Sequence, residues 1–141
     1  MRALGTHFHE HRVRYRECDP MGVVYHAHYV DFFEAARTEA LRKTGISYRS
    51  IEESGVFMPV IDLSVNYIRP AHYDDLLVIE CRGFLSDSGV KVRFDYAVRR
   101  KDEEAVLAEG TVHLCFLERE RKRPVSAPDF VVKSLARGSH A

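Results

Sequence analysis

Hydrophobic and polar residues follow two different periods along the chain, and the early part has the period of a helix. Between about residues 26 and 43, apolar residues recur at spacings of three and four, which places them on one face of an amphipathic helix. A short helical turn is predicted next, with Ser47 as its N-cap and its end near Gly55. The apolar stripe of the long helix consists of Tyr29, Phe33, Ala36 and Ala40.

From residue 57 onward the period changes to two, which is typical of β-strands. The alternation of apolar and charged residues is most regular over residues 90–99, and the preceding residues 86–89 have the composition of a hairpin turn. A first strand is predicted before the helix. The predicted strands cover residues 7–15, 57–67, 76–84, 90–99 and 106–117.

This order of strands and helix predicts an α+β fold. The last four strands are joined by short turns, so we expect them to be antiparallel neighbours, because parallel pairing needs longer crossovers. The longest strands would measure roughly 40 Å if straight, against roughly 27 Å for the helix. We therefore expect a five-stranded antiparallel sheet that wraps around one long central helix.

The composition indicates one folded domain over residues 1–141. Its core is expected at about residues 8–120, with a C-terminal tail at 121–141 that looks loosely attached from Pro124 onward. The 21 basic residues balance the 21 acidic ones, which argues against nucleic acid as the main partner. No apolar run approaches the roughly 18 residues that a membrane span needs.

The three cysteines are an odd number without a CxxC pair, which argues against a disulfide framework. Together with the lack of an apolar leader segment, this predicts a reducing, cytoplasmic location. Cys18 precedes Asp19 on an extended segment and points to the opposite side. We therefore expect Cys18 to be a small core residue.

The chain has no glycine-rich nucleotide motif, no GxSxG and no HExxH, so the candidate chemistry lies in the segment before the long helix. Pro20 keeps Asp19 extended, and Gly22 lets the backbone bend closely beside a ligand. No capping side chain stands near Tyr25 or His26, which leaves N–H groups free to hold a carbonyl oxygen. Asp19 either forms an Asx turn or is the carboxylate that hydrolyses an activated acyl group.

The histidines do not form an obvious metal site. His7, His9 and His11 share one face of the first predicted strand, a geometry that is compatible with a metal, but no carboxylate joins that face in the sequence. His26 and His28 are two residues apart on a helix and do not converge. We therefore expect no metal, and His26 either orients a substrate or only packs.

Basic residues are concentrated locally although the net charge is zero. Six of them, against two acidic residues, lie between Arg82 and Lys101, and a second basic run covers residues 119–123. These runs are either solvated faces or a site for a phosphate-bearing ligand. The best candidates for phosphate contacts are Lys91, Arg93, Arg99 and Arg100.

The segment Asp19–Tyr29, with Phe32–Arg37 after it, resembles the acyl-CoA thioesterases of the hotdog fold. Within that fold it looks most like the group of 4-hydroxybenzoyl-CoA thioesterase and YbgC-like proteins. The stretch Tyr67–Ala71, together with Asp74–Leu77, is similar to a second recurrent stretch of that group. The resemblance covers roughly residues 8 to 120.

The resemblance implies a hotdog fold that pairs into homodimers or homotetramers with active sites between subunits. A sheet face that one helix cannot cover and a long edge strand also favour self-association. In that family the acid at the position of Asp19 acts as nucleophile or general base, and an N–H at or beside His26 polarises the thioester carbonyl. The implied substrate is an acyl-CoA, and no cofactor is expected because coenzyme A is part of the substrate.

Gly22, Tyr25 and His28 belong to the same matching segment and are expected to contact the substrate. Two positions depart from the pattern of the family. His28 stands where YbgC-like members often have Asn, which points to a different choice of acyl group. Glu17 stands where many members have Asp, at a distance from the catalytic position.

The sequence therefore predicts an acyl-CoA thioesterase, with two alternatives. A hotdog hydratase or dehydratase needs an acid and a base at neighbouring carbons of the acyl chain, and His26 is able to supply one of them. A non-catalytic module that binds acyl thioesters is the alternative outside the enzymes. The position of Asp19 before the helix favours hydrolysis.

Overall fold

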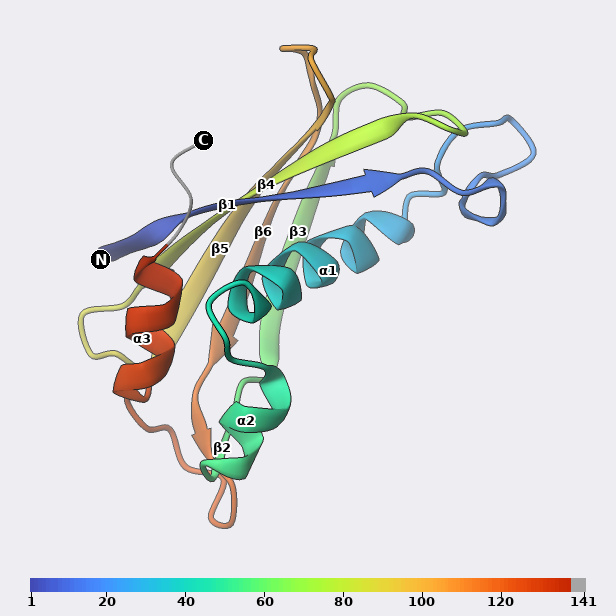
Figure 1. The fold of residues 1–141 in the computed structure, drawn as a ribbon. Helices are drawn as coiled ribbons and strands as arrows, with labels where there is room; N and C mark the ends of the chain where they lie inside the picture. Colours follow the sequence, from blue (N-terminus) through green and yellow to red (C-terminus); the bar gives the residue numbers. More distant parts are fainter. Residues whose placement is uncertain (138–141) are drawn as a thin grey trace.

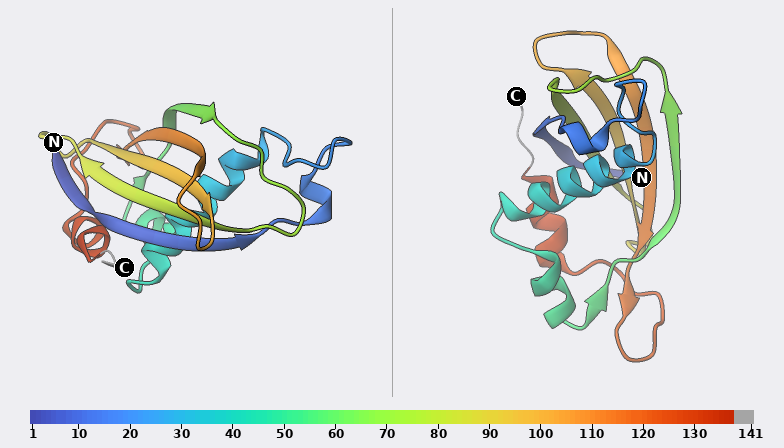
Figure 2. Two further views of the ribbon diagram at one scale, coloured as in Figure 1. Left: turned by 90° about the horizontal axis from the view of Figure 1, so that it is seen from above. Right: turned by 90° about the vertical axis from the view of Figure 1, so that its right-hand side faces the viewer.

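The structure is a computed structural model that describes residues 1–137 of the chain. Its elements in chain order are β1 (Arg2–Arg12), η1 (Tyr15–Glu17), α1 (His28–Arg42), α2 (Tyr48–Glu53), β2 (Val56–Phe57), β3 (Val60–Tyr67), β4 (Leu76–Leu85), β5 (Lys91–Arg100), β6 (Val106–Cys115), β7 (Leu117–Glu118) and α3 (Asp129–Ala136). Five strands form one antiparallel sheet in the order β1-β4-β5-β6-β3, and β2 pairs with β7. Figures 1 and 2 show this sheet curving around α1, so the predicted α+β architecture is confirmed.

Helix α1 packs against the inner face of the sheet through the apolar stripe that the sequence predicts. Phe33 is fully buried, and its ring stacks on the ring of Tyr96 in β5 with the centroids 4.3 Å apart. A Cβ atom at Gly110 in β6 would overlap the Phe33 ring, so glycine is what permits this close approach. This contact fixes the position of α1 on the sheet.

The prediction that the last four strands are neighbours in chain order is wrong for β3 and β4. These strands lie apart, because β3 pairs with β6 and β4 pairs with β1. Residues 68–75 carry the chain across the end of the sheet, and the N–H groups of Ile68 and Arg69 both donate to the carbonyl oxygen of Leu107. Eight extended residues reach about 27 Å, more than the roughly 15 Å that separates the two strands.

The expected strand over residues 57–67 is two strands in the structure. It breaks after Phe57, because β2 pairs with β7 whereas β3 joins the main sheet. Strand β3 was also expected to be half-buried, yet Val60, Ile61 and Leu63 remain 49%, 47% and 40% exposed. Strand β3 is an edge strand, and within residues 1–137 no other strand pairs with its outer edge.

The first strand is displaced toward the N-terminus from the predicted residues 7–15. It begins at Arg2 and ends at Arg12, where Val13 instead exchanges backbone hydrogen bonds with Asp74 and Asp75. The chain then turns through η1 toward the candidate site. The strand therefore leads directly into the segment that the sequence singles out.

The expectation of a loosely attached tail is wrong for the described residues. Helix α3 packs on β1 and α1, and its residues Val131 and Leu135 are buried in the core. The imidazole Nε2 of His7 donates a hydrogen bond to the carbonyl oxygen of Leu135 over 3.0 Å. The apolar pair at spacing four explains the docking, and the predicted tail residues 138–141 lie outside the described part of the chain.

Candidate active site

Asp19 sits at the start of a tight turn between η1 and α1. Its backbone N–H donates to the carbonyl oxygen of Val23, and the N–H of Gly22, with φ of +81°, donates back to the carbonyl oxygen of Asp19. The carboxylate oxygen Oδ1 accepts N–H hydrogen bonds from Met21 at 2.9 Å and from Val23 at 3.4 Å. The Asx turn is therefore present, and it occupies only one carboxylate oxygen.

Asp19 and His26, the two predicted catalytic residues, line the same cavity of about 330 Å³. Among residues 1–137, no group donates a hydrogen bond to Oδ2 of Asp19. One side of the cavity comes from the turn and the start of α1, and the other comes from the end of β3 and the segment after it. The lining residues are Asp19, Val23, Val24, His26, Tyr29, Tyr67, Ile68, Arg69 and Pro70.

The start of α1 has no side-chain cap, as the sequence predicts. The N–H groups of residues 28–30 donate to the carbonyl oxygens three residues earlier, at 3.0 to 3.4 Å. By contrast, the N–H groups of His26 and Ala27 donate to no acceptor within the described residues. The free donors thus lie just before the helix, one on His26, which lines the cavity, and one on Ala27, the next residue in the chain. The positive end of the helix dipole is next to them.

The opposite wall contains residues to which the sequence analysis gave no role in the site. The hydroxyl group of Tyr67 donates a hydrogen bond to the carbonyl oxygen of His26 over 2.8 Å. The Tyr67 ring meets the Tyr29 ring edge-on at 5.4 Å, and burial raises the pKa of the Tyr29 hydroxyl. The only signal in the sequence was the recurrent stretch that begins at Tyr67.

Three other predicted contacts lie outside the cavity lining. Gly22 forms the turn itself, and its open surroundings show no contact within 4 Å of an added Cβ atom. Tyr25 is largely exposed and packs its ring on the imidazole of His26 at 4.3 Å. The Nδ1 atom of His28 lies 3.2 Å from the Oδ2 atom of Asp31 on the first turn of α1.

The four predicted phosphate contacts are not brought together. Lys91 lies at one end of β5 and Arg100 at the other end, which separates them by about 30 Å along the strand. The two residues between them are paired with acids on the sheet, because Arg93 contacts Asp95 and Arg99 contacts Glu80.

Arg100 is the predicted basic residue nearest to the cavity. Its Nε atom lies 2.8 Å from Oδ2 of Asp75, and its Nη2 atom donates to the carbonyl oxygen of Pro70 over 2.8 Å. Burial alone would raise the pKa of Asp75, but the backbone N–H of His72 and the Arg100 guanidinium hold that pKa below its ordinary value. Arg100 therefore supports the cavity wall at Pro70.

Two cysteines have thiols that favour the protonated form. Burial, followed by the nearby acids Glu17 and Asp19, raises the pKa of the Cys18 thiol, which favours the protonated form. Burial raises the pKa of Cys81 to about 12. Residues 1–137 contain no group of three His, Cys, Asp or Glu side chains able to hold a metal ion. That part of the chain also has no helix long and apolar enough to cross a membrane.

Comparisons with known proteins show the family of the chain. Residues 13–135 match the family model of the thioesterase-like superfamily. The acyl-CoA thioesterase YbgC of Haemophilus influenzae is 34% identical over 119 residues, which cover 83% of this chain and 85% of that protein. The acyl-CoA thioester hydrolase YbgC of Escherichia coli O157:H7 is 34% identical over 121 residues, covering 86% and 89%.

Two solved structures share the fold over most of their length. The 1,4-dihydroxy-2-naphthoyl-CoA thioesterase Slr0204 from Synechocystis superposes with a TM-score of 0.88 at 21% identity, covering 94% of this chain and 97% of that one. The DHNA-CoA thioesterase from Staphylococcus aureus has a TM-score of 0.74 at 29% identity, covering 86% and 80%. The chain therefore belongs to the thioesterase-like superfamily and is a thioester hydrolase with the hotdog fold.

Proposed function

We propose that the protein hydrolyses an acyl-CoA to the free acid and coenzyme A, with Asp19 as the carboxylate that acts on the thioester. One observation carries this proposal: Asp19 and His26 line one cavity, and the N–H groups of His26 and its neighbour Ala27 donate to no acceptor within residues 1–137. The names of the YbgC relatives support acyl-CoA as the substrate class.

The N–H groups serve as the oxyanion hole. The thioester carbonyl oxygen binds at the His26 and Ala27 N–H groups, and the positive end of the α1 dipole favours the negative charge that develops there. Such donors act through preorganisation, because the helix and the hydrogen bond from Tyr67 to the carbonyl oxygen of His26 already hold this segment in place. Removing one such donor in other enzymes costs about 10²- to 10³-fold in kcat.

Asp19 is proposed to act as the nucleophile or as the general base. Its Oδ2 either attacks the acyl carbon or removes a proton from a water molecule that attacks it. In the general-base route the water oxygen bonds to the acyl carbon, the bond to sulfur breaks, and the thiolate of coenzyme A takes up the proton that Asp19 removed from the water. In the nucleophilic route Oδ2 bonds to the acyl carbon as the thiolate leaves. A water molecule then hydrolyses the resulting anhydride, which releases the free acid, restores Asp19 and supplies the proton for the thiolate. A single turnover in ¹⁸O water that leaves label in Asp19 would demonstrate the nucleophilic route.

The adenine nucleotide end of coenzyme A is proposed to bind near Arg100. Arg100 contacts the cavity wall at Pro70, so a cofactor-length chain leaving the cavity on that side meets its guanidinium. Arg99 is the next residue along β5, whereas Lys91 lies at the far end of the strand. Binding of phosphates at this end should affect affinity and leave the chemical step unchanged.

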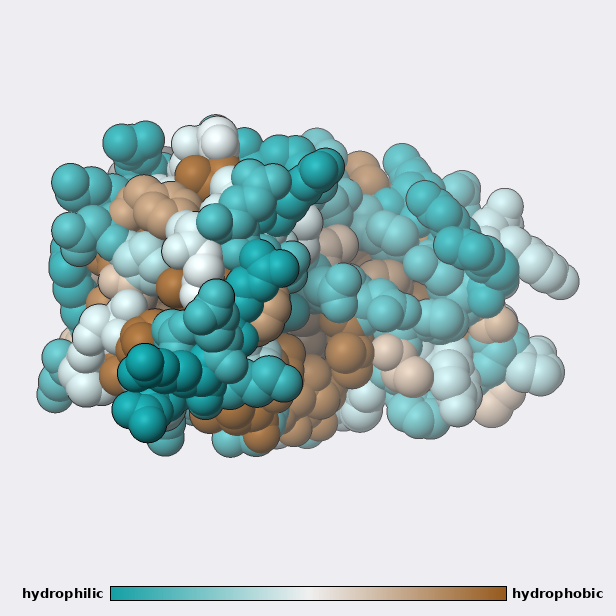
Figure 3. Space-filling model, turned by 90° about the horizontal axis from the view of Figure 1, so that it is seen from below, coloured by the Kyte–Doolittle hydropathy of each residue, from teal (hydrophilic) through white to brown (hydrophobic). Residues whose placement is uncertain are grey.

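Self-association through β3 is the proposed assembly. Strand β3 is an edge of the sheet, and its exposed side chains Val60, Ile61, Leu63 and Tyr67 are apolar or aromatic. Figure 3 shows apolar residues gathered on the underside of the molecule, the end at which α2 and β2 lie. Pairing with a second copy covers such an edge and yields a homodimer, or a homotetramer of two dimers.

The three free cysteines are consistent with the proposed cytoplasmic location.

A panel of acyl-CoAs with aromatic, short and long acyl groups tests the function. Release of free thiol, together with the free acid, is the expected result for at least one substrate. A hydratase would add water to an alkenoyl-CoA without releasing thiol. A binding module would do neither, so either of these outcomes would overturn the proposal.

A further inference from the structure

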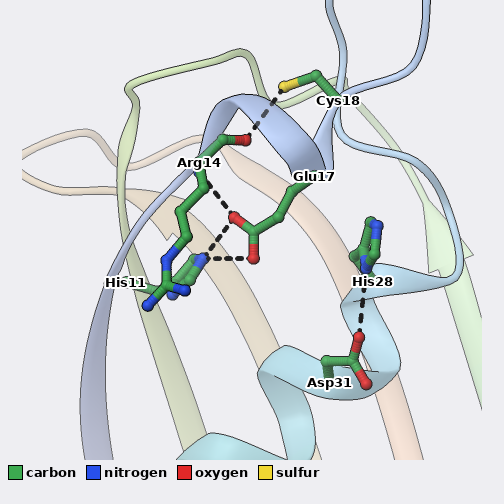
Figure 4. A network of polar contacts seen from close by, with 6 residues as sticks. All are labelled: His11, Arg14, Glu17, Cys18, His28 and Asp31. Atoms are coloured by element: carbon green, nitrogen blue, oxygen red, sulfur yellow. Dashed lines mark hydrogen bonds and ion pairs between the residues drawn. The ribbon is translucent and has the colours of Figure 1, made fainter.

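Glu17, two residues before Asp19 in the chain, has a buried carboxylate that lies outside the cavity that Asp19 lines. The side chain of Glu17 is 12% exposed, and Figure 4 shows it pointing toward His11. The Nε2 atom of His11 lies 2.8 Å from Oε1 and 3.1 Å from Oε2 of Glu17. The backbone N–H of Arg14 also donates to Oε1, over 2.7 Å. Glu17 therefore joins the end of β1 to the turn η1.

The backbone of Glu17 lies at the base of the loop that carries Asp19. Its carbonyl oxygen accepts a hydrogen bond from the N–H of Tyr25 over 2.9 Å. One residue farther into the loop, Cys18 pairs with Val24 in an antiparallel bridge. The outgoing and returning strands of the loop are thus tied together at Glu17 and at Cys18; Asp19 follows Cys18 on the outgoing strand, and His26 follows Tyr25 on the returning strand.

The same network also reaches α1. The His11 ring packs against the ring of Phe32 with the centroids 4.5 Å apart, and Phe32 is buried on α1. The side chain of His11 is 18% exposed, so its contact with Glu17 is largely shielded from water. Shielded hydrogen bonds to a carboxylate are stronger than exposed ones, and leaving their partners unpaired is costly.

We infer that Glu17, held by His11, is a positioning residue that sets the location of the Asp19 carboxylate relative to the N–H groups before α1. This inference rests on the proposed function of Asp19. Neither Glu17 nor His11 lines the Asp19 cavity; both face a separate hollow between β1 and α1. Glu17 acts through the loop it closes and does not touch the substrate.

Glu17→Gln tests the inference, because the amide keeps the shape but removes the charge that holds His11. Displacing a catalytic group by about 1 Å can cost 10²-fold, so we expect kcat to fall by about 10- to 100-fold while KM changes little. Glu10→Gln is the matched control, because Glu10 precedes His11 on β1 and its carboxylate pairs with Lys101 at the surface. The control should keep the kcat of the original protein.

A double-mutant cycle with Asp19→Asn separates positioning from general structural support. If Glu17 acts through Asp19, Glu17→Gln lowers kcat in the original protein but not the residual rate of Asp19→Asn. Equal fold losses in both backgrounds would overturn the inference, and so would unchanged kcat in Glu17→Gln. Failure of the proposed function is seen separately, as normal turnover by Asp19→Asn alone.

A second pair of variants applies if Glu17→Gln does not fold. His11→Gln retains an N–H donor for Glu17 and should retain kcat, whereas His11→Leu removes the donor and should lower kcat with little change in KM. The same kcat for the two variants would overturn the inference.

Discussion

The hydroxyl group of Tyr67 donates a hydrogen bond to the carbonyl oxygen of His26 over 2.8 Å. This bond connects the end of edge strand β3 to the segment just before α1, although the two residues are 41 positions apart. It fixes the peptide segment whose N–H groups are proposed to hold the thioester carbonyl. Strand β3 therefore contributes to the site through the backbone of another segment.

Tyr67→Phe should lower kcat because it releases this segment without changing the ring. A net hydrogen-bond contribution of about 1 kcal/mol corresponds to a loss of about fivefold. Steady-state kinetics with the best acyl-CoA of the panel measures the effect, and Tyr73→Phe, on the exposed loop before β4, is the control. Full activity of Tyr67→Phe would show that the bond does not matter for catalysis.

Local patterns predicted α1 and the joint position of Asp19 and His26, because both depend on residues close together in sequence. The apolar residues around Phe33 recur at spacings of three and four, which predicts a helix that is buried on one face. The pairing of β3 with β6 depends instead on the path of residues 68–75 across the end of the sheet. The spacing of apolar residues does not predict this path.

Side-chain partners from distant segments were equally hard to predict. The basic pattern around Arg100 suggested free phosphate contacts, but Arg100 pairs with Asp75 and Arg99 with Glu80 across neighbouring strands. Val131 and Leu135 lie in the predicted loose tail, yet they are buried where α3 packs on β1 and α1. In each case the local sequence pattern identifies one residue of the contact, but its partner lies on a distant segment and is known only from the fold.

His7 should make the stability of the fold depend on pH. Burial lowers the pKa of His7 below its ordinary value of 6.5, although the hydrogen bond to Leu135 opposes this shift. The unfolded chain therefore binds the proton more readily, so stability is fully present above pH 6.5 and is lost as the pH falls toward the lower folded pKa.

Urea unfolding at about pH 7 and about pH 5 measures this effect. His7→Gln has no imidazole to protonate, so its stability should fall less over this interval than that of the original protein. Equal losses for the two proteins would assign the acid sensitivity to other groups.

Arg100 is expected to bind the nucleotide end of the substrate. Arg100→Gln should raise KM for an acyl-CoA more than for the matching acyl-pantetheine, with kcat nearly unchanged, because uniform binding is lost. Asp75→Asn is the control, since it breaks the same ion pair but keeps the cation. Equal changes for both substrates, or the same change in Asp75→Asn, would reduce Arg100 to a structural role.

Charges on β3 should prevent self-association. The original protein is expected to have at least twice the 16.2 kDa mass of one chain, and Ile61→Lys with Leu63→Lys should give the monomer. Light scattering at micromolar concentration measures both masses, and Tyr73→Lys controls for an added charge elsewhere on the surface. A monomeric original protein with full activity would contradict assembly through β3.

The turnover number of Asp19→Asn is the most direct test of the account. The asparagine Oδ1 can accept the same N–H groups of Met21 and Val23, so the turn should persist while the nucleophile and base are lost. General-base assistance alone contributes about 10²- to 10⁴-fold, so kcat should fall at least that far while acyl-CoA still binds. Near-normal turnover by a folded Asp19→Asn would contradict the site and leave Asp19 with only its role in the turn.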